Sequence, residues 1–269
     1  MKIQNQSMIA FSTYRYQRNV TNLTKTLEKL SSGLKIYRAS DDAAGLSISE
    51  TLRAQIRGLA QSQRNMQDGL SVLKAAEEGL MNVNHLLQRI RELAVQNAND
   101  TLDAKDRAAS QKELDQLLQA IDDTAEKLEF NTKKILGENI PLTLQVGANP
   151  GQTITVDMVD TSTTSLGLNG ATLLTRTDAE QLITKVDNAL KKVTNDLTNV
   201  GADYEAIEHH LNNTMLKEAN LTTSESMLRD ANIAREMMNY ISGKIRQQGD
   251  YLLISHINRN VEETLKLFT

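Results

Sequence analysis

Apolar residues recur at alternating spacings of four and three toward both ends of the chain, a spacing that places them along one stripe of an α-helix. One stripe covers residues 9–34, and the corresponding stripes of the second half cover 186–211 and 227–245. Two further stripes cover 52–94 and 114–128. The pattern therefore predicts several long helices whose apolar seams can interlock. The seam residues at the two ends are Ile9, Thr13, Tyr16, Val20, Leu23, Leu27, Leu30 and Leu34, and Met227, Ala231, Ala234, Met238, Ile241 and Ile245.

Short polar segments predict where these helices begin. The first stripe ends in a polar segment in which Ser40 is the predicted N-cap of the next helix. Thr177 with Glu180, and Thr222 with Glu225, have the spacing of a capping box, in which each side chain bonds the backbone N–H of the other residue. We therefore expect helix starts near these residues.

The middle of the chain carries a different pattern. Residues 142–146 and 154–158 alternate apolar and polar side chains, with Pro150 and Gly151 between them, and such alternation around a Pro-Gly turn is typical of a β-hairpin. Residues 160–177 are rich in Ser, Thr, Gly and Asn, which predicts a surface connection and an insertion site.

Helical ends separated by a hairpin predict a mainly α fold. Its architecture would be a long antiparallel helical coiled-coil rod that pairs the N- and C-terminal segments, with a small β-hairpin in the core domain. A single helix pair buries little apolar surface against an ordering entropy of about 1–2 kcal/mol per residue. We expect the terminal seams to need partner molecules, which favours a self-assembling structural protein.

Composition narrows the function classes. The 269 residues include 30 basic and 34 acidic side chains, a net charge of −4, which lacks the basic excess of a nucleic-acid-binding protein. Cysteine is absent, which excludes disulfides and thiolate chemistry. No stretch approaches the roughly 18 apolar residues of a membrane span, and the polar run at residues 4–7 interrupts the apolar core of a secretory signal peptide. We expect neither nucleic-acid binding nor membrane insertion.

The polar residues form no recognisable catalytic motif. The histidines lack His-Glu-x-x-His spacing, and His209 and His210, as neighbours on a helix, point about 100° apart and cannot share a metal face. The acidic doublets fail the same test for an acid and base pair and are interpreted as helix starts or solvated faces; they are Asp41-Asp42, Glu77-Glu78, Asp122-Asp123 and Glu262-Glu263. No Gly-rich phosphate loop is present. We predict no enzyme activity, no cofactor and no metal.

The methionines of the second half could form an adaptable binding face, but two of them lie on the seam. We therefore expect the group to pack in the core; it consists of Met215, Met227, Met237 and Met238.

Several runs of residues carry a family resemblance. They are LEKLSSGLKI at 27–36, RASDDAAGLSISE at 38–50, QIRGL at 55–59, LQRIRELAVQ at 87–96, QVGAN at 145–149 and ANL at 219–221. Together these runs closely resemble bacterial flagellin, the subunit of the flagellar filament.

The resemblance implies three parts. They are terminal coiled-coil helices at 1–40 and 230–269 that form the inner filament wall, a helical core domain at 41–158 and 177–229 with the hairpin near 142–158, and a residual variable-region loop at 159–176. The implied inner-wall assembly seam consists of Ile9, Tyr16, Val20, Leu23, Leu27, Leu30, Leu34, Met227, Met238, Ile241, Ile245, Val261 and Leu265.

The resemblance also implies a function and partners. A flagellin is secreted through the type III export apparatus without a cleaved signal peptide, and it polymerises beneath a cap into an extracellular helical filament for swimming motility. The implied partners are further copies of the chain, a flagellar export chaperone, and the cap and hook-junction proteins. In many flagellins the vertebrate Toll-like receptor for flagellin reads an arginine-rich core segment. The positions that match it are Arg89, Leu93 and Glu113, which we also expect to form a subunit contact.

Three alternatives stay open at this point. The hook–filament junction protein shares the terminal runs, although residues 31–50 fit flagellin better. A cytoplasmic coiled-coil adaptor would have the same seams. A metalloprotease in the variable region is opposed by the missing zinc motif.

The charged tail, with Glu262, Glu263 and Lys266, departs from the usual flagellin ending.

Overall fold

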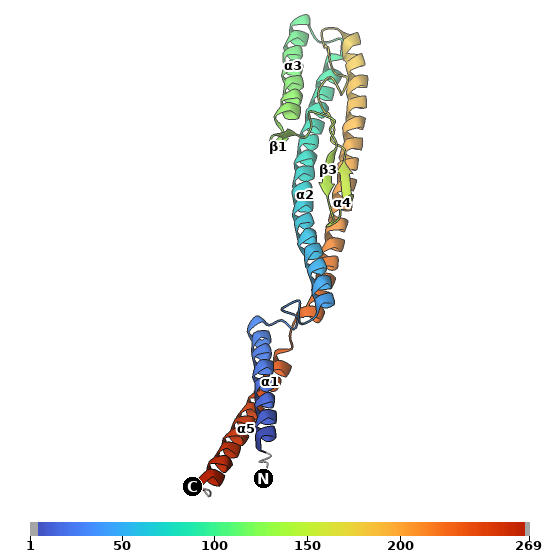
Figure 1. Cartoon of the computed structure of the whole chain (residues 1–269). Coiled ribbons are helices and arrows are strands. Elements are labelled where there is room, and N and C mark those ends of the chain that lie inside the picture. The colour runs from blue at the N-terminus through green and yellow to red at the C-terminus, as the bar shows by residue number, and fades with distance from the viewer. Residues whose placement is uncertain (1–4, 267–269) are drawn as a thin grey trace. The chain divides into compact units, whose positions relative to one another are not determined.

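The computed structural model describes residues 5–266, including the side chains of residues 7–259, Glu262 and Glu263. The described chain forms α1 (Asn5–Ser32), α2 (Ala43–Asn97), α3 (Ala104–Lys127), β1 (Glu129–Phe130), β2 (Lys133–Lys134), β3 (Leu142–Gln145), β4 (Thr153–Val156), α4 (Arg176–Arg229) and α5 (Ile233–Lys266) (Figure 1). The predicted mainly α fold with a small β-hairpin is confirmed.

The chain divides into two compact units. The terminal unit comprises residues 1–54 and 220–269, and the central unit comprises residues 55–219. These divisions fall inside α2 and α4. The domain boundaries predicted from sequence lie instead at the non-helical segments between α1 and α2 and between α4 and α5.

Two of the helix starts differ from the predicted residues. α2 begins after Asp42, whose Oδ1 accepts the Gly45 N–H at 2.9 Å, so Asp42 rather than Ser40 caps this helix. α4 begins after Thr175, whose Oγ1 accepts the Asp178 N–H at 3.1 Å. This capping pair lies two residues before the predicted one.

The predicted start at Thr222 is wrong, because α4 continues without a break to Arg229. Residues 216–219, LKEA, are strong helix formers and carry the helix through this region. The break follows instead at residues 230–232, where Asn232 Oδ1 accepts the Arg235 N–H at 3.1 Å and caps α5.

β3 and β4 form the predicted hairpin of the central unit. Leu142 pairs with Val156 in antiparallel register, and Gly151 takes a φ of +82° in the turn. Leu144 packs over Gly69 of α2, where a Cβ would collide with the leucine Cδ1. Gly69 therefore lets the hairpin approach α2 closely.

A second hairpin, β1–β2, was not predicted. Its turn residues Asn131 and Thr132 have φ values of +49° and +66°, as in a type I′ turn. Asn-Thr is a much weaker sequence signal for this turn than Asn-Gly.

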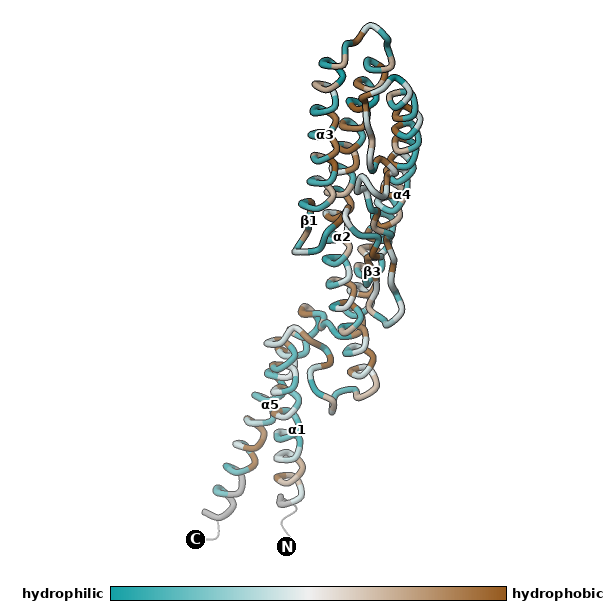
Figure 2. The backbone as a smooth tube through the Cα atoms, turned by 90° about the horizontal axis from the view of Figure 1, so that it is seen from above, coloured by the Kyte–Doolittle hydropathy of each residue, from teal (hydrophilic) through white to brown (hydrophobic). Residues whose placement is uncertain are grey.

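α2, α3 and α4 turn their apolar faces into one core of the central unit. Leu87 and Ile90 of α2, Ile121 of α3 and Val193 of α4 are all fully buried. Brown hydrophobic positions alternate with teal hydrophilic ones along these helices in Figure 2, as expected for helices with one buried face. None of the helices described between residues 5 and 266 is long and apolar enough to cross a bilayer.

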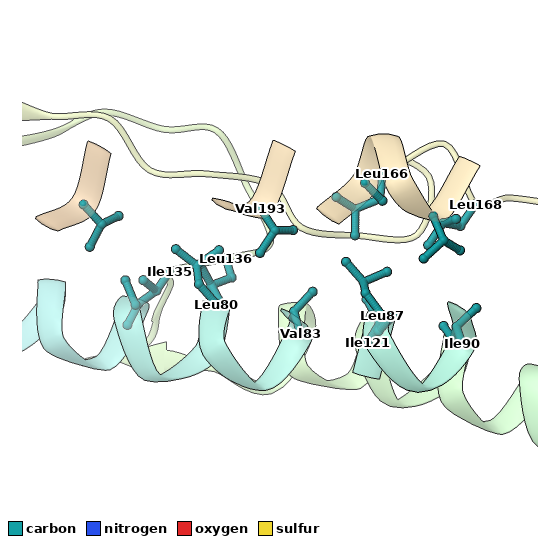
Figure 3. Packing of buried hydrophobic residues seen from close by; sticks show 14 of the residues in the cluster. Leu80, Val83, Leu87, Ile90, Ile121, Ile135, Leu136, Leu166, Leu168 and Val193 are labelled. Carbon is teal, nitrogen blue, oxygen red and sulfur yellow. The ribbon is translucent and has the colours of Figure 1, made fainter. Parts of the chain in front are cut away.

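Residues 159–175, called the strap below, belong to this core, and their prediction as a surface connection is wrong. The strap has no regular secondary structure, but it buries Thr161, Thr163, Leu166, Leu168, Ala171 and Leu173. In Figure 3, Leu166 and Leu168 lie among side chains from α2 and α4. The strap is therefore a packed layer of the core.

The strap is also tied to α3 by its backbone. Asp122 Oδ1 accepts the Thr163 N–H at 2.8 Å, and Asp122 Oδ2 accepts the Thr163 hydroxyl at 2.9 Å. The interpretation of Asp122 as a solvated-face residue is thus wrong. The interpretation as a solvated-face residue fits Asp123, which pairs with Lys127 on the exposed side of the same helix at 2.7 Å.

Candidate assembly surface

The terminal unit leaves most of its apolar surface uncovered. Ile36, at 3% exposure, is the only apolar side chain buried in the described part of this unit. The large apolar side chains that are exposed there are Met8, Phe11, Tyr14, Leu27, Tyr37, Ile48, Met227, Ile233, Met237, Met238, Ile241, Ile245, Tyr251, Leu252 and Leu253. Many exposed large apolar side chains in one unit are typical of an interaction site.

α1 and α5 pack against each other as an antiparallel pair. A Cβ placed on Gly243 would lie 3.0 Å from Leu23 Cδ2, so the two helices approach closely at this point. Lower exposure recurs every three or four residues on each helix and marks the facing stripes. On α1 the stripe consists of Ile9, Ser12, Tyr16, Asn19, Leu23, Thr26 and Leu30. On α5 it consists of Glu236, Tyr240, Gly243, Gln247, Asp250, Ile254 and Ile257, called the inner stripe below.

A buried carboxylate lies in this helix pair. Asp250 is 3% exposed, its Oδ1 lies 3.2 Å from the Arg15 guanidinium, and its Oδ2 accepts a hydrogen bond from the Asn19 amide. Removing the partners of a buried charge is costly. The contacts of Asp250 with Arg15 and Asn19 therefore tie this side of α5 to α1.

The apolar residues of α5 lie on a different stripe. Ala234, Met238, Ile241, Ile245, Gln248 and Leu252, called the outer stripe below, are all exposed and keep the same four and three spacing. The outer stripe is offset from the inner one by two residues, or roughly 200° around the helix. The four large apolar side chains of the outer stripe are 52–67% exposed. Met238, Ile241, Ser242, Ile245 and Arg246 line an open groove along this face, of about 390 Å³.

The structure places the predicted seam residues whose side chains it describes in three groups: packed against α5, half-buried, and exposed. Ile9, Tyr16, Leu23 and Leu30 belong to the α1 face that packs on α5, whereas Leu27 is 52% exposed. Val20 and Leu34 are half-buried, and Met227, Met238, Ile241 and Ile245 are all exposed in the single chain. The side chains of Val261 and Leu265 lie outside the described residues.

The expectation that the methionines pack in the core is wrong for this chain. Met215, Met227, Met237 and Met238 are 49–80% exposed. For Met238 the physical reason is the rotation of α5, because the stripe that faces α1 is the polar one.

A polar cluster that sequence reasoning missed connects α2 with the end of α4 inside the terminal unit. Arg229, 8% exposed, donates to Glu50 Oε1 at 2.6 Å and to Ser49 Oγ at 3.2 Å. The Ser49 hydroxyl donates to Glu225 at 3.1 Å. The Arg229 hydrogen bond, followed by its charge, lowers the pKa of Glu50. The Arg229 backbone carbonyl also accepts the Lys35 N–H at 2.7 Å, next to the helix break.

Arg89 and Glu113 are brought together on the central unit. Glu113 Oε1 accepts hydrogen bonds from Arg89 Nε at 3.1 Å and Nη2 at 2.7 Å, and Glu92 pairs with the same guanidinium at 3.0 Å. The hydrogen bond to Glu113 is the main cause that raises the pKa of Arg89. Leu93 lies in the core at 2% exposure, so its side chain is not part of this surface.

The described residues contain no group of three or more His, Cys, Asp or Glu side chains that could hold a metal ion. The described features of the molecule are an apolar helix stripe, a buried carboxylate paired with Arg15, and an exposed ionic cluster.

Comparisons with known proteins agree with this picture. Two family models match the sequence, one described as the bacterial flagellin N-terminal helical region over residues 4–140 and one as the bacterial flagellin C-terminal helical region over residues 183–268. A flagellin of Halalkalibacterium halodurans is 39% identical over 269 residues, which cover 98% of this chain and 99% of the relative. The crystal structure of Bacillus cereus flagellin has a TM-score of 0.52 and 34% identity, covering 56% of this chain and 88% of that chain. A putative flagellar hook-associated protein from Vibrio parahaemolyticus shares the fold, with a TM-score of 0.60 and 15% identity over 70% of this chain and 99% of that chain.

Proposed function

Because this chain belongs to the bacterial flagellin family, we propose that it is a structural, non-catalytic subunit that polymerises into the bacterial flagellar filament for swimming motility. The observation that carries the proposal is the terminal unit, which buries Ile36 alone among its described apolar side chains while the outer stripe of α5 is solvent-exposed. Copies of the chain would cover this surface in a filament.

The mechanism couples folding of the terminal unit to assembly. α1 and α5 contain 28 and 34 residues, and ordering them costs about 1–2 kcal/mol per residue for the backbone alone. Apolar surface covered by neighbouring copies contributes about 25 cal/mol per Å². Contacts between copies therefore stabilise the helical form of the terminal unit by mass action, whereas the central unit has a core of its own.

Truncation tests this mechanism. A chain lacking residues 235–269, or one lacking residues 1–35, should stay soluble and keep the cooperative unfolding transition of the central unit, measured by circular dichroism. Neither chain should extend sheared filament fragments into long filaments, as judged by electron microscopy. Growth of filaments from either truncated chain would refute the mechanism.

We also propose the route and the partners that the family implies. The chain would leave the cell through the flagellar type III apparatus with its N-terminus uncleaved, helped by an export chaperone, and would assemble between the hook-junction and cap proteins. Filaments sheared from cells should contain the chain with its original N-terminus, as read by mass spectrometry. Recovery only from the cytoplasm would favour the coiled-coil adaptor instead.

The hook–filament junction alternative is not favoured. The chain is 39% identical to a flagellin over nearly its whole length, whereas the likeness to the hook-associated protein is one of fold. Filament length separates the two, because only the filament subunit grows long homopolymers.

The ionic cluster on α2 and α3 supports a second contact. We propose that the exposed pair Arg89 and Glu113 contacts neighbouring subunits and is read by the vertebrate Toll-like receptor for flagellin. Arg89→Ala should lower the signal of purified subunit in an epithelial reporter assay by tenfold or more. Arg91→Ala is the matched control, since Arg91 lies two residues away and pairs with Asp187 at 2.8 Å. A silent wild-type subunit, or equal loss in both variants, would oppose receptor recognition through this pair.

A further inference from the structure

α5 carries two heptad stripes of opposite character, and the polar one faces α1. The inner stripe contains Gly243, Gln247 and Asp250, whereas the outer stripe contains Met238, Ile241, Ile245 and Leu252. A helix pair driven by apolar burial alone would turn α5 by two residues and bury the outer stripe against α1. Specific contacts must therefore hold α5 in the observed rotation.

We propose that Asp250, held by Arg15 and Asn19, fixes the rotation of α5 so that its outer stripe stays off α1 and is kept for the terminal unit of a second copy of this chain. The proposal deepens the proposed function and rests on it, because it names the surface through which copies join.

Two contacts oppose the turned arrangement. Turning α5 would take the Asp250 carboxylate away from the Arg15 guanidinium at 3.2 Å and from the Asn19 amide. It would also bring Ile241 to the place of Gly243, where even a Cβ atom lies 3.3 Å from Leu23 Cγ. The polar contact and the close helix approach thus select the same rotation, in the way that a single polar seam residue specifies register in coiled coils.

The position of the apolar surface indicates that the occupant is a second copy of the chain. The outer stripe spans residues 234–252, which is about 27 Å of helix at 1.5 Å per residue. α1 exposes a separate apolar group, Met8, Phe11 and Tyr14, at 59–63%. A helix pair with two distinct apolar surfaces can join copies head to tail, so each added copy leaves a free surface for the next. An open chain of contacts of this kind matches a filament and would not close into a dimer.

Two adjacent glutamines provide a matched test of the surface. Gln248 lies on the outer stripe and is exposed, whereas Gln247 lies on the inner stripe and is partly covered. Gln248→Leu should lower the critical concentration for seeded filament growth several-fold, and Gln247→Leu should leave it within twofold of wild type. Ile245→Glu should raise it at least tenfold. Equal effects of the two leucine variants, or normal growth of Ile245→Glu, would overturn the proposed surface.

A cross-linking cycle tests the rotation, and the absence of native cysteine makes it specific. In the full-length chain, Leu23→Cys with Gly243→Cys reports the observed rotation, and Leu23→Cys with Ile241→Cys reports the turned one. With Arg15→Leu and Asn19→Leu, Asp250 loses both partners, so oxidation should shift from the first pair to the second and filament growth should stop. Adding Asp250→Leu removes the unpaired charge but restores neither contact, so the second cross-link should persist and growth should not return.

The outcomes distinguish failure of the proposed function from failure of the proposed role of Asp250. A wild-type chain that never extends filament seeds contradicts the proposed function. A wild-type chain that grows normally, with cross-linking that stays at residue 243 when Arg15 and Asn19 are replaced, contradicts the proposed role of Asp250 alone. If a protein that is not a flagellin binds the outer stripe in a one-to-one ratio and this binding alone blocks growth, that protein and not a second copy is the occupant. This result would overturn the proposal.

Discussion

Leu168 in the strap provides a sharp test of how the central unit is built. Its side chain is fully buried, and in Figure 3 it lies near Ile90 of α2. Leu168→Ala removes buried methyl groups and leaves a cavity that a strap tied at both ends can fill only partly. Substitutions of this type lower the free energy of unfolding by about 2–5 kcal/mol. For a unit of this size each kcal/mol lowers the unfolding temperature by about 2–4 °C, so a shift on the order of 5–15 °C is expected.

The matched control is Leu174→Ala, in which the same substitution is made six residues away at a side chain that is 55% exposed. Exposed substitutions change stability by about 0.5 kcal/mol or less. Thermal unfolding of both full-length variants, followed by circular dichroism, measures the difference. If both variants unfold at the wild-type temperature, the strap is a surface loop as the sequence pattern suggested, and its assignment to the core is wrong.

Three further changes follow from individual contacts. Asp122→Ala should lower the free energy of unfolding, measured by urea titration, by about 1–3 kcal/mol, because it leaves the Thr163 N–H unpaired. The control Asp123→Ala loses one surface ion pair and should lower the free energy of unfolding by less than about 0.5 kcal/mol. Burial raises the pKa of Asp196, so its ionised form is disfavoured in the folded chain. Asp196→Asn should therefore raise the unfolding temperature at pH 7. This gain should be lost as the pH falls through the folded pKa of Asp196 toward its lower unfolded pKa. The Arg229 hydrogen bond lowers the pKa of Glu50, so its stabilisation is complete above the unfolded pKa of this carboxyl and is lost as the pH falls through the lower folded pKa. Hydrogen exchange at residues 43–54 should accelerate over that range in wild type and lack this component in Glu50→Gln.

The helices and the main hairpin could be predicted from sequence because local signals and tertiary packing agree there. Leu87, Ile90 and Val193 fall on apolar stripes and are buried against one another across the core. The break before α2 was recognisable as a polar segment, although the capping residue itself depends on which side chain reaches a free N–H. Such choices differ by one or two residues and carry little periodic signal.

The strap could not be predicted, because the spacing of its buried side chains matches neither the period of a helix nor that of a strand. Its buried side chains recur at spacings of two or three along an irregular path between Thr161 and Leu173, and threonine and glycine, which usually indicate surface turns, make up much of it. What places the strap inside is remote in sequence: Asp122 and Gln111 of α3 accept the N–H groups of Thr163 and Leu173. Contacts between residues 41 to 62 positions apart leave no trace in a local pattern.

The rotation of α5 shows a more general limit of reading heptads. The heptad pattern predicts that the N- and C-terminal helices pair, and it gives α5 one seam, which includes Met238, Ile241 and Ile245 and is expected to need partner molecules. The structure turns that stripe outward and faces α1 with a stripe that includes Gly243 and Asp250. In a chain built to assemble, the most apolar stripe is best reserved for another copy, because a stripe buried within the chain cannot join subunits. The sequence does contain a signal for the inner stripe, because Gly243 and Asp250 of α5 match Leu23 and Arg15 of α1. This signal is the complementarity of two helices about 200 residues apart in the chain, so it is not visible in either helix alone.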